Sequence, residues 1–376
     1  MTDSEPASRP ENPDTASAAP GDEQLAAEPM NTDSASQNPR YMLRQQSPVP
    51  GSPYKVSTTQ ADALRSAQKT VDWYRRKRRR QLWICLFLFL ATLVSTTLVG
   101  SGYRPLLLLP GFFNEKIWSH RLLGEFSRLY LQSLVQGFSY SGPLMLILLC
   151  HEMGHFLQAV RYRVPASFPF FIPLPIPPLG TMGAVIAQGR GAADRKQMFD
   201  IAVSGPLAGL LVTIPVLYVG IKESTFGVIP SGPVPEFGEP LIIQWMIAWI
   251  HGPTPDGQTL YMNGFAHAGW VGVLVTALNL IPIGQLDGGH LTYTLLGRPA
   301  HRIAIVVVGV AAAWMILTKT YAYILLLILI LITGTKHPPT RDDTAPLGVF
   351  RHVVGWLTLS FLLIGFTPTP ISIGGG

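Results

Sequence analysis

The chain has 376 residues, of which 48% are hydrophobic and 13% are charged, and its mean hydropathy is +0.29. This composition excludes an ordinary soluble domain and indicates a polytopic membrane protein, with the lipid bilayer as its surroundings. The formal net charge is +6, and the basic residues at 75–80 form one run directly before an apolar stretch. The run therefore predicts membrane orientation, and no nucleic-acid partner is expected.

Residues 1–74 are predicted to form a disordered cytoplasmic tail. The stretch up to about residue 70 is rich in Pro, Ser, Ala, Thr, Asn and Gln and has almost no aromatic residues with which to build a core. A basic flank and the first transmembrane helix are predicted at 75–100. This pair mimics a signal peptide but lies too deep in the chain, so we interpret it as an uncleaved signal anchor.

The remaining hydropathy pattern predicts an all-α polytopic membrane protein with six or seven transmembrane helices. The fifth and sixth apolar stretches are short for a bilayer, which needs about 20 residues, and could form a tight hairpin or one broken segment. We assign a catalytic membrane core to 134–290 and C-terminal transmembrane helices to 291–376. The apolar stretches lie at 82–99, 134–160, 201–221, 265–283, 303–317, 321–333 and 353–366.

The basic run predicts a cytoplasmic N-terminus, and a bacterial cell membrane is the expected location. The second and fourth spans then return inward, which brings 151–155 and 279–287 to similar depth on the same side. Basic residues in loops expected to be cytoplasmic support this scheme: Arg190, Arg195, Lys196, Arg298 and Arg302. Other basic residues lie in the loop that this scheme places outside, and they argue against the scheme unless the loop forms an interfacial helix: Arg104, Lys116, Arg121 and Arg128.

Two further stretches are not expected to span the membrane. Residues 165–186 are apolar but carry repeated prolines, which forbid a regular helix. Irregular backbone at membrane depth must be buried in protein or line a wet cavity, so a re-entrant element is predicted there, with an edge strand at 180–186. The long outer loop 223–263 is expected to carry an interfacial helix at 241–250.

The chemistry-bearing motif is HExxH, formed by His151, Glu152 and His155. Histidines at i and i+4 share one helix face and can hold one metal ion, and the glutamate between them can activate a bound water. The preceding residues are strongly apolar, and ionisable groups at membrane depth indicate function. The alternative is a helix-end cluster satisfied by lipid headgroups and backbone carbonyls.

A second polar island lies within apolar sequence at 279–290, where Pro282 and the glycines break the helix. Asp287 is the best candidate there for the third ligand that catalytic zinc needs. His290 competes for that role, Asp287 could instead cap the following helix, and Cys150 is on the wrong helix face. Asn279 could hold a substrate peptide or satisfy the backbone freed by Pro282.

These motifs resemble the site-2 protease family of intramembrane zinc metalloproteases, peptidase family M50. The resemblance rests on HEMGH at 151–155, PPLGTMGAVI at 177–186, VSGPLAG at 203–209 and NLIPIGQLDGGH at 279–290. It implies one Zn²⁺ per chain bound by His151, His155 and Asp287, with Glu152 as the catalytic glutamate.

The same resemblance implies that Asn279 contacts the substrate and that the strand at 180–186 pairs with an unwound transmembrane substrate. The stretches 161–200 and 222–265 are too short for the PDZ domain that many relatives insert, so a minimal form is expected. The oligomeric state is left open.

The sequence therefore predicts a zinc-dependent endopeptidase that cleaves within or next to transmembrane segments of membrane proteins. Three alternatives remain open. A protease of the kind that trims prenylated proteins would complete its site with a second glutamate. A transporter or channel would use the histidines as an ion path. A catalytically inactive scaffold would bind transmembrane partners without cutting them.

Overall fold

The computed structural model describes residues 58–112, 120–189, 191–228, 234–335 and 337–374. The chain divides into two compact units, Met1–Lys77 and Arg78–Gly376. The predicted tail at 1–57 lies outside the described residues, but helix α2 begins at Thr58 and spans Thr58–Gly100. Residues 58–74 of the predicted tail are therefore helical in the structure, and this part has no Gly or Pro and is rich in helix formers. The disorder of the tail stays a prediction.

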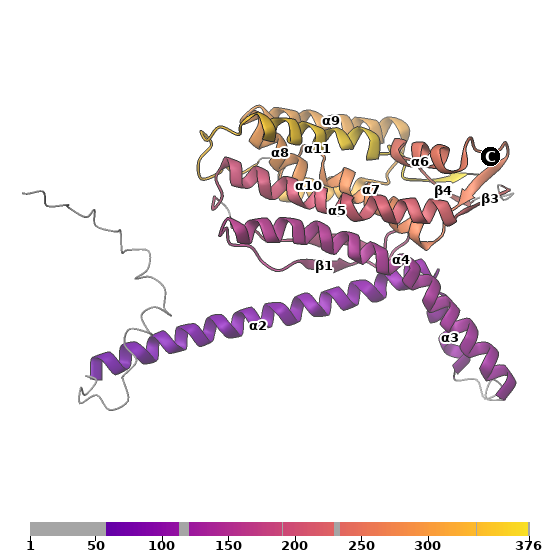
Figure 1. Ribbon diagram of the computed structural model, residues 1–376, viewed down its shortest axis with the longest axis horizontal. Helices are drawn as coiled ribbons and strands as arrows, with labels where there is room; N and C mark the ends of the chain where they lie inside the picture. Colours follow the sequence, from indigo (N-terminus) through magenta and orange to yellow (C-terminus); the bar gives the residue numbers. More distant parts are fainter. Residues whose placement is uncertain (1–57, 113–119, 190, 229–233, 336, 375–376) are drawn as a thin grey trace, which may run out of the picture. The chain divides into compact units, whose positions relative to one another are not determined.

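The chain is mostly helical, and Figure 1 shows its helices and strands in sequence colours. The helices after α2 are α3 (Arg104–Phe112), α4 (His120–Arg161), α5 (Arg195–Glu223), α6 (Leu241–His251), α7 (Gly264–Asn279), α8 (Asp287–Leu296), α9 (Ala300–Thr318), α10 (Ile324–Thr333) and α11 (Val349–Gly365). The strands are β1 (Phe170–Pro173), β2 (Thr181–Val185), β3 (Thr225–Val228), β4 (Val234–Phe237), β5 (Gln258–Tyr261) and β6 (Ile371–Gly374).

Four helical segments are long and apolar enough to cross a membrane: Arg78–Gly100, Gly124–Arg161, Arg195–Glu223 and Ala300–Thr318. Shorter apolar helices, α6, α10 and α11, accompany them. The expected spans at 82–99, 134–160, 201–221 and 303–317 fall within the four long segments. The fifth expected span, 303–317, is part of a longer helix, because α9 has 19 residues. The fourth expected span, 265–283, is longer than the observed helix, because α7 ends at Asn279.

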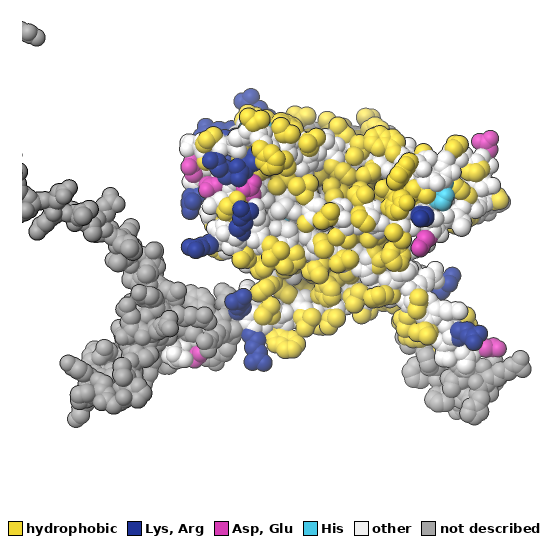
Figure 2. Space-filling model, viewed as in Figure 1, with side chains coloured by type: hydrophobic (Ala, Val, Ile, Leu, Met, Phe, Trp, Pro, Cys, Tyr) yellow, Lys and Arg dark blue, Asp and Glu magenta, His cyan; other side chains and the backbone are white. Residues whose placement is uncertain are grey.

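The surface carries the signature of a bilayer protein. Figure 2 shows a broad band of hydrophobic side chains over the helical part, with lysine, arginine and acidic side chains gathered toward the helix ends. Large apolar side chains on the outside include Trp83 on α2, Leu211 on α5 and Leu317 on α9. A multi-pass membrane protein is therefore confirmed, because exposed apolar surface of this extent fits lipid and not water.

The described residues contain three two-stranded antiparallel sheets, β1–β2, β3–β5 and β4–β6, so "all-α" holds only in the sense of mostly helical. The strand expected at 180–186 is confirmed as β2, with Phe170 opposite Val185 and Phe171 opposite Ala184. The helix expected at 241–250 is confirmed as α6. Its place at a membrane interface stays a prediction.

The β1–β2 hairpin is held by its neighbouring helices. The Ser95 hydroxyl of α2 donates a hydrogen bond to the Gly180 carbonyl at 2.6 Å. The Tyr140 hydroxyl of α4 donates to the Leu179 carbonyl at 2.7 Å, and the Phe89 and Phe171 rings meet edge to face. The irregular, proline-rich backbone is thus supported by protein, as the re-entrant prediction required.

Helix α5 packs against both α4 and α7 (Figure 1). Its start is set by Asp194, whose carboxylate accepts from the Gln197 backbone while the Gln197 side chain accepts from the Asp194 backbone, a capping box. The fully buried side chains that these three helices contribute to the core include Tyr140, Phe199, Leu217 and Trp270. This core fixes the relative depth of the α4 and α5 residues that form the site.

An ion pair ties α5 to the C-terminal helix α11. Arg351 Nε and Nη2 donate to the two carboxylate oxygens of Asp200, each at 2.8 Å. The Tyr162 hydroxyl at the end of α4 donates to the same carboxylate. The side chains of Arg351 and Asp200 are 32% and 14% exposed, so the pair is partly shielded from water and bridges three segments.

We predict that Arg351→Met lowers the free energy of unfolding by about 1–3 kcal/mol, because it leaves the shielded Asp200 carboxylate without its cation. The matched control is Arg341→Met, whose guanidinium is 63% exposed and lies 3.9 Å from Asp194. That change should cost less than about 1 kcal/mol. Thermal unfolding in detergent micelles measures both, and equal shifts for the two variants would contradict the prediction.

Candidate metal centre

Helix α4 carries the HExxH residues on a buried face. His151 and Glu152 are 4% and 6% exposed, and the apolar residues Leu144, Ile147 and Leu148 precede them in the helix and are buried. Because i and i+4 lie one above the other on a helix, the His151 and His155 Nε2 atoms come within 3.3 Å of each other. The expected shared face is present.

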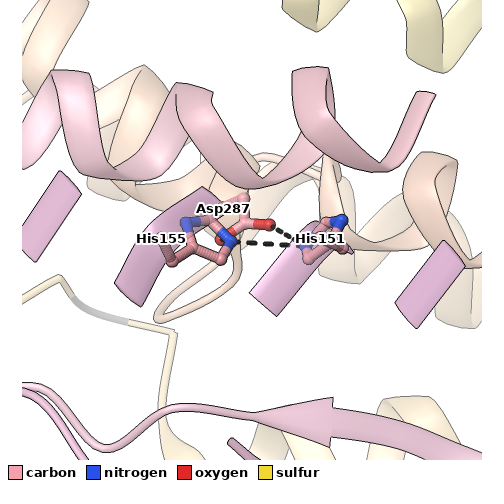
Figure 3. A group of neighbouring side chains, drawn as sticks. All are labelled: His151, His155 and Asp287. Carbon is pink, nitrogen blue, oxygen red and sulfur yellow. Dashed lines mark hydrogen bonds and ion pairs between the residues drawn. The ribbon is translucent and has the colours of Figure 1, made fainter. Parts of the chain in front are cut away.

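Asp287, 136 positions after His151 in the sequence, lies against this face. Helix α7 ends at Asn279 and α8 begins at Asp287, and the turn between them presents the carboxylate to both imidazoles (Figure 3). Asp287 Oδ2 lies 3.1 Å from His151 Nε2, and Oδ1 lies 3.2 Å from His155 Nε2. The two motifs predicted to lie at similar depth do meet.

The donor set fits a zinc ion. Tetrahedral zinc with bonds of about 2.0–2.2 Å requires ligand atoms about 3.3 Å apart. The three contacts here are 3.1, 3.2 and 3.3 Å, and one ligand atom from each of His151, His155 and Asp287 lies within 4.8 Å of the others. Two imidazoles and one carboxylate also match the ligand types of catalytic zinc sites, which leave a fourth position open.

The orientation of His155 is fixed by α5. Its Nδ1–H donates to the Ile201 carbonyl at 2.7 Å, which leaves Nε2 free to face Asp287. When one ring nitrogen of a histidine donates a hydrogen bond in this way, the bond selects the tautomer and directs the other nitrogen toward a metal. Ile201 follows Asp200, so the α5–α11 ion pair lies beside the carbonyl that orients this ring.

Glycines let α5 approach α4 at the site. A Cβ at position 154 would lie 2.4 Å from the Ser204 carbonyl oxygen, and one at position 205 would lie 2.0 Å from His155 Nε2. The lack of a side chain at Gly154 therefore permits a close approach of the α5 backbone. The role of Gly205 was missed from sequence, although its i, i+4 spacing with Gly209 in VSGPLAG is a known signal for close packing of membrane helices.

The three side chains open onto a cavity of about 160 Å³, which has room for several water molecules. Glu152 and Asn279 line it together with the ligand cluster, and Asn279 Nδ2 lies 3.4 Å from His151 Nε2. Another wall is formed by Ala184, Val185 and Ile186, at the end of β2. The ligand cluster, the Glu152 carboxylate and the end of β2 therefore border one cavity.

The structure bears on the alternatives for the role of Asp287 and for the third ligand. Asp287 makes no side-chain cap for α8, whose N-cap is Leu286, so the capping alternative is not supported. His290 lines the same cavity, but its Nδ1 contacts His337 Nε2. Cys150 is half-buried and stands outside the cluster of three formed within the described residues.

Helix α8 contacts the segment 337–348. The Tyr293 hydroxyl donates to Asp343 Oδ2 at 2.8 Å, and the Thr340 hydroxyl donates to Oδ1 at 2.6 Å. Burial raises the pKa of Asp343, but these two hydrogen bonds outweigh it and hold that pKa below its usual value. Burial and the neighbouring His290 lower the pKa of His337 to about 3, so His337 contacts His290 as a neutral ring.

The fold and the site define a polytopic membrane protein with a metal centre of the HExxH type, completed by an aspartate from a distant broken helix. Residues 140–318, which contain both motifs, match the family model described as Peptidase family M50. Over these residues the chain is similar to that family.

Curated plant proteins are similar to the chain. "Probable zinc metalloprotease EGY1, chloroplastic" of Oryza sativa subsp. japonica is 34% identical over 165 residues, 42% of this chain and 28% of the relative. The protein of the same name from Arabidopsis thaliana is 28% identical over 231 residues, 59% of this chain and 41% of the relative. The chain therefore spans less than half the length of these relatives.

We predict that Gly205→Ala lowers the zinc content of the purified protein, because the new methyl group would occupy the position of His155 Nε2. Gly124→Ala, on the α4 helix, is the matched control, since a Cβ there meets nothing within 4 Å. Metal analysis per chain measures the effect. Full zinc content in Gly205→Ala would show that α5 does not approach His155 as closely as the structure indicates.

Proposed function

We propose that the protein is a zinc-dependent intramembrane endopeptidase that hydrolyses peptide bonds within or next to transmembrane segments of membrane proteins, as in regulated intramembrane proteolysis. The observation that carries the proposal is the meeting of His151, His155 and Asp287 in one cavity that also holds Glu152 and borders a strand edge. The match of residues 140–318 to the family model and the names of the relatives support it.

We assign His151, His155 and Asp287 as the ligands of one zinc ion per chain. Bound there, zinc would polarise the scissile carbonyl and lower the pKa of a water molecule. The chain's own contribution is to hold the ligands at fixed spacing, through the α4 helix for the histidines and the turn before α8 for the aspartate. The buried walls also limit the access of bulk water, which strengthens electrostatic interactions in the cavity.

Glu152 is assigned as the general base and acid. It follows His151 directly and lines the cavity with it, so a water molecule beside the ligand cluster lies within its reach. Glu152 takes the proton of the attacking water and then delivers it to the leaving amine. Asn279, whose amide is close to His151, is assigned to hold the substrate peptide at the cluster.

The substrate would bind as an extended segment. A transmembrane helix hides its carbonyl groups in internal hydrogen bonds, so hydrolysis requires local unwinding. Among the described residues β2 is paired only with β1, so its other edge could pair with an opened segment, as in strand addition, and the strand's end lies on the cavity wall. The edge strand could thus hold the unwound backbone, and the ligand cluster could take part in its hydrolysis.

The proposal includes the membrane arrangement. Six or seven spans, a cytoplasmic N-terminus and a bacterial cell membrane remain our assignment. Four long apolar segments and the shorter apolar helices α10 and α11 support six of these spans, and α7, at the place of the fourth expected span, supports a seventh. The described parts of 161–200 and 222–265 hold the β1–β2 hairpin, β3, β4, α6 and β5, which favours the minimal form without a PDZ domain.

Glu152→Gln should reduce cleavage of single-span substrates by at least a thousandfold, because the amide cannot accept the proton of water. Zinc content should stay at the parent level, since Glu152 is outside the ligand cluster. A proteoliposome assay with metal analysis measures both. Retained proteolysis would exclude this mechanism, while an inactive parent on every substrate would favour the scaffold or transporter alternatives.

Asp287→Ala should release the zinc and abolish cleavage, because two imidazoles alone hold the ion weakly. The matched control is His290→Ala, which removes a nearby histidine that contacts His337 and not the cluster. That variant should keep its zinc. Metal analysis after dialysis distinguishes them, and loss of zinc only in His290→Ala would reassign the third ligand.

A further inference from the structure

The cavity has a polar residue on its wall to which neither the motifs nor the family match assigns a role. Gln188 lies beyond the end of β2 and lines the cavity with His151, His155 and Asp287. We propose that Gln188 is a substrate-binding residue that donates its side-chain amide to a backbone carbonyl of the extended substrate. This inference rests on the proposed function and names a further contact for its substrate.

The backbone at Gln188 continues the strand edge. Gln188 forms an antiparallel bridge with Ala166, and the neighbouring hydrogen bonds run from Ser167 N to Ala187 O and from Gly189 N to Pro165 O, both at 2.9 Å. Residues 166 and 188 are therefore a non-hydrogen-bonded pair, whose own N–H and C=O groups point away from each other's strand. At Gln188 these groups face the open edge, so β2 is extended by one more pairing position.

The side chain of Gln188 has an unmet donor. Its Nε2 is buried and has no hydrogen-bond partner among the described residues. A buried amide donor without a partner is costly, and such groups in native proteins call for an explanation, such as a bound ligand. Because the residue lines the cavity, an occupant of the cavity can supply the missing acceptor.

The acceptor is best supplied by a peptide backbone. The neighbouring wall residues Ala166, Ala184, Val185 and Ile186 are apolar, so they suit the apolar side chains of a transmembrane segment. When that segment unwinds, its carbonyl groups lose their helical partners at membrane depth and need new donors. The Gln188 amide stands beside the edge along which those carbonyls would lie.

The test is steady-state kinetics of the full chain in proteoliposomes, with zinc content measured for each variant. Gln188→Met keeps the length of the side chain and removes the amide. It should raise KM roughly tenfold, the loss expected for one hydrogen bond, with kcat and zinc content close to those of the parent, because the contact is made before and during reaction alike. An unchanged KM would overturn the proposal.

The matched control moves the amide to the other face of the strand. Ala187 is exposed and adjacent residues of a strand face opposite sides, so Ala187→Gln with Gln188→Ala should be as impaired as Gln188→Met. Parent-like KM in this double variant would overturn the proposal. Substrates with different side chains around the cut should all lose affinity to the same extent, and a loss confined to one polar side chain would exclude a backbone contact.

A second measurement does not depend on the kinetics of the variants. In the Glu152→Gln chain, a photo-reactive benzoylphenylalanine in place of Gln188 should cross-link to an uncleaved single-span substrate, whereas the same group in place of Ala187 should not. Cross-linking from both positions or from neither would contradict the assignment. If the parent cleaves no substrate, the proposed function itself fails; if the parent is active and only the Gln188 results are negative, this inference alone fails.

Discussion

The structure depends on the contact of one carboxylate with two imidazoles inside an apolar helical core. His151 is 4% exposed, and Asp287 lies within 3.2 Å of both His151 and His155. Polar groups at such depth are costly unless they are paired or bind a metal. Two features of the surrounding segments make that pairing possible: the break between α7 and α8, and the close approach of α4 and α5.

The close approach of α5 has two effects on the cluster. The absence of side chains at Gly154 and Gly205 lets the α5 backbone reach the ring of His155, and the Ile201 carbonyl then fixes its tautomer through Nδ1. The ion pair of the preceding residue, Asp200, with Arg351 anchors this part of α5 to α11. Packing, hydrogen bonding and charge therefore act on one ring, which must be held within a fraction of an ångström to bind a metal.

The site also accounts for a strand in a mostly helical membrane protein. A substrate that unwinds in the bilayer exposes backbone donors and acceptors that lipid cannot satisfy. The hairpin β1–β2 offers a strand edge that ends at the cavity, and the amides of Gln188 and Asn279 line the same space. Under the proposed function, the cavity would replace the lost helical hydrogen bonds, and the ligand cluster and Glu152 would carry out the hydrolysis.

Much of this site could be predicted from sequence, because the decisive patterns are local. HExxH places His151 and His155 on one face through helix geometry alone, hydropathy puts that face among apolar spans, and prolines exclude a helix at 165–186. The helical start at Thr58 was missed because composition averages over a boundary. Only the tertiary structure brought Asp287, and not His290, into contact with both histidines, across 136 positions from His151, and left the Gln188 amide buried without a partner among the described residues. Those outcomes depend on which helix faces pack together, and spacing along a chain does not encode that contact.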